Sequence, residues 1–211
     1  MKKIACIVTS LFVVLTMAAQ TKVTWSMELG LGMSTWMGKD AGNSSALFNQ
    51  KVGVGIDVPL SGLVSFQTGL FWASKGASMD VNIANQTVDV VNMHVNQNYF
   101  EMPLLAAFHV GTAANFDMVF TAGPYLAYGV NGKRDMDIED LTLSYSTFGD
   151  SKIDGVVLPG LNRFDAGVMA GVALDFERWT VGLDGEFGCC KVVSGSKTRN
   201  LAFYFTAAYK F

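Results

Sequence analysis

The sequence has few of the residues that rigid soluble or disulfide-linked folds depend on. It holds 3 cysteines, 4 prolines and 2 histidines, and only 16% of its residues are charged. Cys189 and Cys190 are adjacent, so on a strand their side chains face opposite ways and cannot easily bridge each other. No CxxC spacing occurs. The pair is interpreted as small apolar residues, with an interchain disulfide as the less favoured alternative, and no metal or cofactor site is predicted.

Basic charge is also scarce, since 15 basic residues stand against 18 acidic ones. Proteins that bind nucleic acid carry a basic face. The mild acidity therefore argues against a nucleic-acid partner.

Beyond the N-terminal region, no apolar run reaches the roughly 18 residues that a transmembrane helix needs. The N-terminal run has Lys2 and Lys3, then the apolar stretch from Ile4 to Met17, then Ala18 and Ala19. This order is typical of a secretory signal peptide. We expect residues 1–19 to be removed, with the bond uncertain by one or two residues, and 20–211 to form a single domain.

The C-terminal run from Leu201 to Phe211 is apolar and aromatic at alternate positions. Its odd positions include Phe203, Phe205, Tyr209 and Phe211, while its even positions are small or polar. Such a strand fits a barrel that faces lipid outside and a polar lumen inside. We interpret these four aromatic residues as a signal for the barrel-assembly machinery.

Eight segments in all show this period of two, with apolar residues on one face and glycine, polar or charged residues on the other. They are 23–33, 52–58, 64–75, 99–109, 116–128, 164–176, 179–189 and 201–211. The alternation predicts an all-β fold, an eight-stranded antiparallel up-and-down transmembrane β-barrel with meander topology.

The connections between these segments alternate in length. Those at 59–62, 111–115 and 177–178 are short, whereas those at 35–50, 76–98 and 130–161 are long and 193–199 is intermediate. Outer-membrane barrels have short periplasmic turns and long extracellular loops. We therefore expect an outer-membrane location with both termini in the periplasm.

The inward positions carry an excess of acid. A barrel of this size is just wide enough for side chains to fill it, and isolated charges in it would be costly. A salt-bridged plug is the favoured interpretation, a proton or cation path is the alternative, and a diffusion pore is not expected. The inward acids are Glu28, Asp57, Glu101, Asp117, Asp165, Asp175, Asp184 and Glu186, and the inward bases are Lys51, Lys75, Arg163 and Lys210.

The four tryptophans are predicted to mark the membrane interfaces, where this residue type is enriched. Trp25 and Trp179 are expected near the periplasmic rim, and Trp36 and Trp72 near the outer rim.

Several strands resemble the PorT-like outer-membrane β-barrel family of Bacteroidota, which shares the small OmpX- or OmpA-like barrel. Tyr99-Phe-Glu-Met-Pro-Leu-Leu105 resembles its Y-x-E-x-P-L-L strand, and Ala122-Gly-Pro-Tyr125 its G-P strand. Phe164-Asp-Ala-Gly167 with Gly171, and the terminal Tyr209-Lys-Phe211, also fit. The resemblance implies an integral barrel but no particular activity. Pro103 and Pro124 each remove a ladder donor, so we expect them at bulges or bends.

Enzymatic chemistry has weak support in the sequence. A lipid-modifying barrel needs a serine activated by histidine. His94 falls in a predicted loop, and His109 is predicted to point inward near the periplasmic rim without a suitable outward serine beside it. The acidic stretch 135–140 lacks the glycine of a calcium loop.

We therefore predict a non-enzymatic outer-membrane barrel that serves envelope structure or surface binding. Its expected partners are outer-membrane lipid and lipopolysaccharide, the barrel-assembly machinery, and an extracellular ligand bound through loops 76–98 and 130–161. We expect segment 76–98 to form a protruding hairpin whose open backbone edge accepts a partner strand. A lipid-modifying enzyme and an accessory component of a secretion system are the alternatives.

Overall fold

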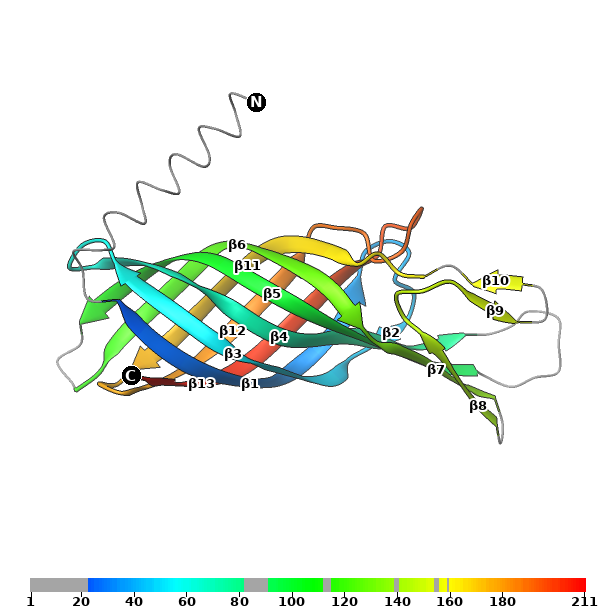
Figure 1. Cartoon of the computed structure of the whole chain (residues 1–211), viewed down its shortest axis with the longest axis horizontal. Helices are drawn as coiled ribbons and strands as arrows, with labels where there is room; N and C mark the ends of the chain where they lie inside the picture. Colours follow the sequence, from blue (N-terminus) through cyan, green and yellow to red (C-terminus); the bar gives the residue numbers. More distant parts are fainter. Residues whose placement is uncertain (1–22, 82–90, 112–114, 139–140, 154–155, 159) are drawn as a thin grey trace, which may run out of the picture.

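Eight long strands of the chain close into one antiparallel barrel (Figure 1). The computed structural model describes residues 23–81, 91–111, 115–138, 141–153, 156–158 and 160–211. The predicted signal peptide lies outside them. The barrel strands are β1 (Thr24–Met37), β3 (Leu47–Pro59), β4 (Val64–Val81), β5 (Val91–Gly111), β6 (Asp117–Asn131), β11 (Phe164–Asp175), β12 (Trp179–Gly188) and β13 (Arg199–Lys210).

Each barrel strand pairs with the next one along the chain, and β1 pairs with β13 to complete the ring. The closing seam is long, running from Ser26 opposite Lys210 to Met37 opposite Arg199. The predicted up-and-down meander is confirmed.

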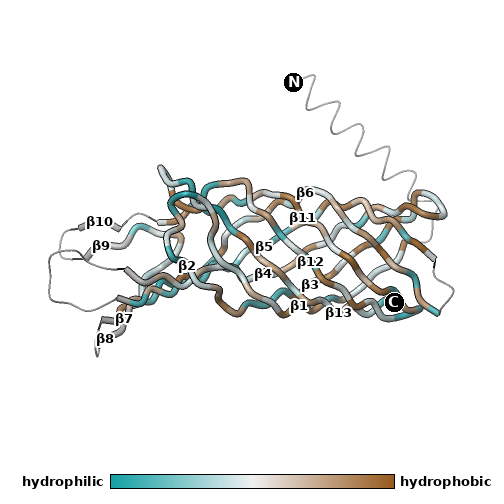
Figure 2. Tube along the Cα trace, turned by 180° about the vertical axis from the view of Figure 1, so that it is seen from behind, coloured by the Kyte–Doolittle hydropathy of each residue, from teal (hydrophilic) through white to brown (hydrophobic). Residues whose placement is uncertain are grey.

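The two faces of each strand differ as the period of two predicts. On β13, Phe203 and Phe205 expose 51% and 55% of their surface, whereas Tyr204 between them exposes 1%. Figure 2 shows the resulting alternation of hydrophobic and hydrophilic positions along the barrel body. Glycines on the inner face let strands approach: a Cβ at Gly32 would lie 1.8 Å from the Phe203 carbonyl oxygen.

The two ends of the barrel are unequal. The short turns between β3 and β4 and between β11 and β12 lie at the end that holds the C-terminus (Figure 1). At the opposite end, the long-loop end, β4 and β5 stay paired up to Val81 opposite Val91. The expected hairpin beyond the barrel is therefore present, and its tip at 82–90 lies outside the described residues.

Additional strands extend this hairpin into a protruding sheet. They are β2 (Ser44–Ser45), which pairs with β4, β7 (Lys133–Ile138), which pairs with β5, and β8 (Leu141–Ser146), which pairs with β7. The short strands β9 (Ser151–Ile153) and β10 (Val156–Leu158) pair separately. Parts of the expected loops 35–50, 76–98 and 130–161 are thus strand. The predicted open hairpin edge is covered on the β5 side, where β7 pairs with β5 and β8 is the outermost strand. On the β4 side only the two-residue strand β2 covers it.

The expected bulges at the two strand prolines are not observed. Pro103 pairs with Tyr125 and Pro124 pairs with Val168, and the register is the same on both sides of each pair. The one register shift between β5 and β6 lies at Asn98 and Tyr99 instead. The pairing is nevertheless interrupted beside the prolines, without an inserted residue. Between β4 and β5 it passes from Thr68 opposite Leu104 to Phe71 opposite Glu101, and between β5 and β6 it passes from Pro103 opposite Tyr125 to Ala106 opposite Ala122. In the first gap the Pro103 carbonyl accepts a hydrogen bond from Thr68 Oγ1 at 2.7 Å.

Within the described residues, no helix has the length and apolarity to cross a membrane.

Candidate functional site: the barrel interior and its two ends

Two lysines and two glutamates form an ion-pair cluster at the centre of the barrel. Lys51 Nζ lies 3.0 Å from Glu101 Oε1 and 2.8 Å from Glu186 Oε1. Lys75 Nζ lies 2.7 Å from the second oxygen of each carboxylate. All four side chains expose 2% or less of their surface. Each carboxylate therefore bridges both ammonium groups, and β3, β4, β5 and β12 are tied together across the lumen.

Asp165 brings the cluster to three carboxylates against two lysines. Its Oδ2 is 3.7 Å from Lys75 Nζ and accepts hydrogen bonds from Tyr125 Oη and Asn200 Nδ2, both at 3.1 Å. The Lys75 ammonium also lies 4.1 Å from the centre of the Tyr125 ring. The added hydrogen bonds and the aromatic face stabilise charges that burial alone would penalise.

Side chains also fill the lumen on the long-loop side of the cluster. Gln97 accepts a hydrogen bond from Trp36 Nε1 at 3.2 Å and donates one to Tyr99 Oη at 2.9 Å. Trp36 exposes only 6% of its surface, so its assignment to an outer aromatic belt was wrong. β1 continues to Met37, beyond the predicted end at residue 33, and even positions on this strand face inward. Gln97 and Tyr204 were not among the predicted site residues.

Where β3 and β4 separate, inward side chains of other strands form hydrogen bonds with the β4 backbone that β3 no longer pairs with. Their last pair toward this end is Lys51 opposite Ala73. Beyond it, Tyr204 Oη donates to the Ser74 carbonyl at 2.6 Å. Ser34 Oγ donates to the Gly76 carbonyl at 2.8 Å and accepts from the Gly76 amide at 2.7 Å. The exposed backbone of β4 is thus satisfied from inside the barrel.

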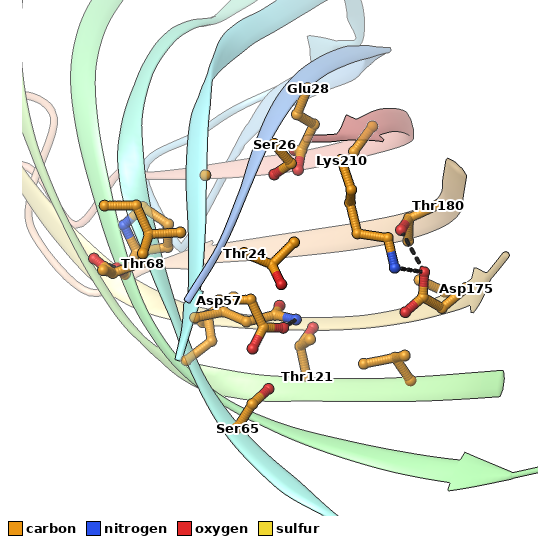
Figure 3. A pocket seen from close by; sticks show the side chains of 18 of the residues that line it. Thr24, Ser26, Glu28, Asp57, Ser65, Thr68, Thr121, Asp175, Thr180 and Lys210 are labelled. Atoms are coloured by element: carbon orange, nitrogen blue, oxygen red, sulfur yellow. Dashed lines mark hydrogen bonds and ion pairs between the residues drawn. The ribbon is translucent and has the colours of Figure 1, made fainter. Parts of the chain in front are cut away.

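A cavity of about 360 Å³ occupies the lumen between the cluster and the short-turn end (Figure 3). Its deep wall includes Lys51 and Phe71, and serine, threonine and carboxylate side chains line the rest. Near its mouth Lys210 Nζ forms an ion pair with Asp175, whose Oδ1 also accepts from Thr180 at 2.8 Å (Figure 3).

The predicted lumen acids thus fall into two groups. Glu101, Asp165 and Glu186 belong to the central cluster, together with Lys51 and Lys75. The others line the cavity: Glu28, Asp57, Asp117, Asp175 and Asp184. Of these, Asp57 accepts from Gln67 at 2.7 Å, and Asp117 is exposed at the rim opposite Asp175. Arg163, expected to face inward, is exposed instead, and its guanidinium donates to the Gly129 carbonyl at 2.9 Å.

A sequence model for an outer membrane protein beta-barrel domain matches residues 18–192 of the chain, which is most of its length. The chain belongs to this family.

The solved structures to which the chain is similar include outer-membrane proteins of low sequence identity. Ail, the attachment invasion locus protein of Yersinia pestis, is 12% identical over 90% of this chain and 99% of its own, with a TM-score of 0.40. OprG of Pseudomonas aeruginosa is 9% identical over 90% and 97%, with a TM-score of 0.49. Neisserial surface protein A is 9% identical over 90% and 97%, with a TM-score of 0.39. No curated protein matches the chain by sequence.

In this outer-membrane barrel, three tryptophans lie on the outer face. Trp25 and Trp179 expose 51% and 56% of their surface near the short-turn end, and Trp72 is half-buried against Phe100 with ring centroids 5.4 Å apart. Tyr209 packs between Trp179 and Phe211, at 4.9 and 5.5 Å. Phe203, Phe205 and Phe211 are exposed on the same outer face.

A serine and a histidine meet at the mouth of the cavity, a contact that the sequence did not predict. Ser65 Oγ lies 2.8 Å from His109 Nε2, and Asp57 Oδ2 lies 3.9 Å from the same nitrogen. In a hydrolase triad the carboxylate holds the other ring nitrogen, so that Nε2 can take the serine proton. Since serine and carboxylate share Nε2 here, the arrangement is a polar rim contact rather than a triad.

The long-loop end has its own buried base and no metal centre among the described residues. Arg134 Nη2 donates to the Ser146 carbonyl at 3.0 Å, and partial burial lowers the pKa of its guanidinium. Asp135 accepts a hydrogen bond from Ser144 at 2.5 Å. Over the described ranges, no three histidine, cysteine, aspartate or glutamate side chains gather as a metal site would require.

Proposed function

We propose that the chain is a non-enzymatic outer-membrane protein that presents its protruding sheet to a partner at the cell surface. Both termini then lie in the periplasm, after removal of the predicted signal peptide. The unequal ends of the barrel support this orientation, since outer-membrane barrels keep their short turns on the periplasmic side.

The observation that carries the proposal is the packed construction of the long-loop end. Ala77 and Val95, which face each other across β4 and β5, expose none of their surface. They belong to one apolar cluster that also includes Trp36 of β1 and one residue from each of four connections, Ala41, Phe148, Leu161 and Val192. The same cluster continues into the barrel through Tyr99, Tyr125 and Met169, so the long-loop end is packed onto the lumen side chains. Loops that only link strands are usually mobile and make few buried contacts. A surface-binding role gives this construction a purpose.

The central cluster supports a structural role for the barrel body. Five buried charged side chains and three buried tyrosines occupy the lumen, which disfavours a diffusion pore. We also infer PorT-like membership from the strand motifs around Pro103, Pro124 and Gly167. The protein after which the PorT-like family is named is associated with a protein secretion system. We do not extend that role to this chain, because the shared motifs describe barrel strands and not a contact with a secretion component.

A replacement of the free edge tests the binding role. Residues 133–146, which form β7 and β8, are exchanged for a Gly-Ser linker in cells that display the protein. As a control, the exposed residues Leu60 and Leu63 of the turn between β3 and β4, at the opposite end of the barrel, are exchanged for serine. We expect adhesion to immobilised extracellular proteins to be lost only with the first variant. Adhesion that survives in a variant still folded by heat-modifiability contradicts the proposal.

Orientation is tested independently by thiol labelling. In a background with Cys189 and Cys190 changed to serine, Ser144→Cys should react with an impermeant maleimide on intact cells, and Ser61→Cys should react only after lysis. The reverse result contradicts the proposed topology.

A further inference from the structure

We propose that four basic side chains on one sector of the long-loop rim, the basic collar, bind the phosphate groups of lipopolysaccharide. The collar consists of Lys39, Lys191, Lys197 and Arg199. This inference goes beyond surface binding by the protruding sheet and rests on the proposed orientation only for the leaflet that the collar meets.

Two loops are bonded together to form the collar. The Lys197 amide donates to Asp40 Oδ2 at 2.7 Å, which joins the loop after β1 to the loop before β13. Gly38, with a φ of 120°, lies so close to Lys197 that a Cβ there would be 2.1 Å from its carbonyl oxygen. The second loop closes on itself through the Val192 amide, which donates to the Thr198 carbonyl at 2.9 Å. The four bases are therefore held on one fixed sector.

The collar begins where the lipid-facing rows end. On β13 the outward positions Phe205, Phe203 and Leu201 are followed by Arg199, which is exposed and pairs with Met37 of β1. Arg199 lies two positions from Leu201 along the strand, a rise of roughly 7 Å. A base at this height lies beside the headgroups when the aromatic row below it lies in the acyl chains.

The collar's charge is not neutralised by the protein. Lys39, Lys191, Lys197 and Arg199 are all exposed, and none forms an ion pair within the described part of the chain. Asp40 is the acid of these two loops, and one of its oxygens is already bonded to the Lys197 amide. Other rim bases differ: Arg163 and Arg134 donate to backbone carbonyls.

This pattern selects an anionic headgroup over a protein partner. Phosphate oxygens accept hydrogen bonds from several lysine and arginine side chains at once, and a base near an anionic membrane surface adds roughly fivefold in affinity. The collar continues a lipid-facing surface, whereas the protruding sheet stands away from it. Lipopolysaccharide is the phosphorylated lipid that meets the extracellular rim of an outer-membrane protein.

Binding of lipid A to the full-length barrel in detergent micelles tests the proposal without depending on orientation. We expect Lys191→Gln/Arg199→Gln to bind at least about tenfold more weakly than the wild type. The matched control, Lys133→Gln/Arg178→Gln, removes the same charge away from the collar and should bind within twofold of the wild type. The charge-preserving variant Lys191→Arg/Arg199→Lys should also retain binding.

Two further lipids identify the source of the phosphate. The wild type should bind dephosphorylated lipid A no more tightly than the collar variant, Lys191→Gln/Arg199→Gln, binds intact lipid A. The wild type should also bind phosphatidylglycerol at least fivefold more weakly than it binds lipid A. Equal binding by the collar variant and the wild type, equal binding of dephosphorylated lipid A, or equal binding of phosphatidylglycerol each overturns the proposal. If the double variant does not fold, Lys191→Gln and Arg199→Gln singly provide the same comparison, with an expected loss of about fivefold each.

Discussion

Lys51 and Glu186, which are 135 positions apart in the sequence, meet at the centre of the barrel with Nζ 2.8 Å from Oε1. Glu186 also lies 2.7 Å from Lys75, and Glu101 repeats both contacts from β5. Neither lysine can be removed without leaving carboxylates buried beside a single cation.

Loss of Lys75 should therefore destabilise the barrel strongly. Removing one partner of a buried ion pair costs about 3–5 kcal/mol, because the other charge stays buried and uncompensated. We expect Lys75→Met to lower the free energy of unfolding by this amount in urea titrations of the barrel in detergent. Lys133→Met, at an exposed lysine of β7, is the control and should change it by less than about 0.5 kcal/mol.

A second substitution separates charge from packing in this cluster. Lys75→Met/Glu101→Gln removes one charge of each sign, so it should recover part of the stability that Lys75→Met loses. No recovery would mean that the side-chain volume of Lys75, rather than its charge, supports the lumen.

Ser34 should contribute to the stability of the barrel because its hydroxyl takes the place of backbone partners that β3 no longer supplies to β4. Its hydroxyl satisfies both backbone groups of Gly76, and Ser34→Ala would leave a buried donor and acceptor unpaired. We expect a loss of about 1–3 kcal/mol in unfolding free energy and faster hydrogen exchange at the Gly76 amide. Ser196→Ala, in the loop before β13, provides a hydroxyl deletion away from this contact. Unchanged exchange at Gly76 in Ser34→Ala would show that water or a neighbour substitutes for the hydroxyl.

Gly32→Ala should disrupt the closing seam. The added Cβ would lie 1.8 Å from the Phe203 carbonyl oxygen, so β1 and β13 would have to separate locally. Overpacking of this kind typically costs about 1–3 kcal/mol. At Gly62, a Cβ would meet no atom within 4 Å, so Gly62→Ala is the matched control. Equal unfolding free energies for the two variants would show that β1 and β13 can separate locally without loss of stability.

Phe211→Ala should impair assembly more than stability. The substitution keeps the Phe211 amide, which donates to the Trp25 carbonyl at 2.9 Å, and removes a ring that is 71% exposed. If the terminal aromatic row is recognised during insertion, outer-membrane levels should fall severalfold while the refolded barrel unfolds within about 1 kcal/mol of the wild type. Phe187→Ala removes an outward ring on β12 that is 42% exposed. Equal levels of the two variants in cells would remove any special role for the terminal residue.

Alternation in the sequence predicted the eight barrel strands and the inward side of each because lipid and lumen impose opposite demands on neighbouring residues. It predicted Glu101, Asp165 and Glu186 as lumen groups for the same reason. Alternation alone shows which side of a strand a residue faces but not its position along the barrel axis relative to residues of other strands. It therefore could not pair Lys51 with Glu186 or Ser65 with His109. That information depends on the register between strands, which the sequence shows only weakly.

The error at Trp36 has a related cause. Tryptophan is common at membrane interfaces, and the alternation weakens after Met33, so the residue was predicted to lie on an outer belt. In the structure β1 continues for four further residues, to Met37, and Trp36 lies on the inner face with its Nε1 hydrogen-bonded to Gln97. Where a strand leaves the membrane, residue type no longer reports which side it faces, because both sides can hold apolar groups.

The pairing of β1 with β13 also determines when the barrel can fold. Its first pair joins Ser26 to Lys210, so the barrel cannot close until the first and last strands, which are far apart in the sequence, come into contact. Bringing such distant segments into contact carries a loop-closure entropy that local hairpins do not, and non-local topologies of this kind fold slowly. Until then β1 has an unpaired edge, which is prone to aggregation. Closure of this seam therefore requires contact between the first and last strands of the barrel, and until it forms both β1 and β13 present an unpaired edge.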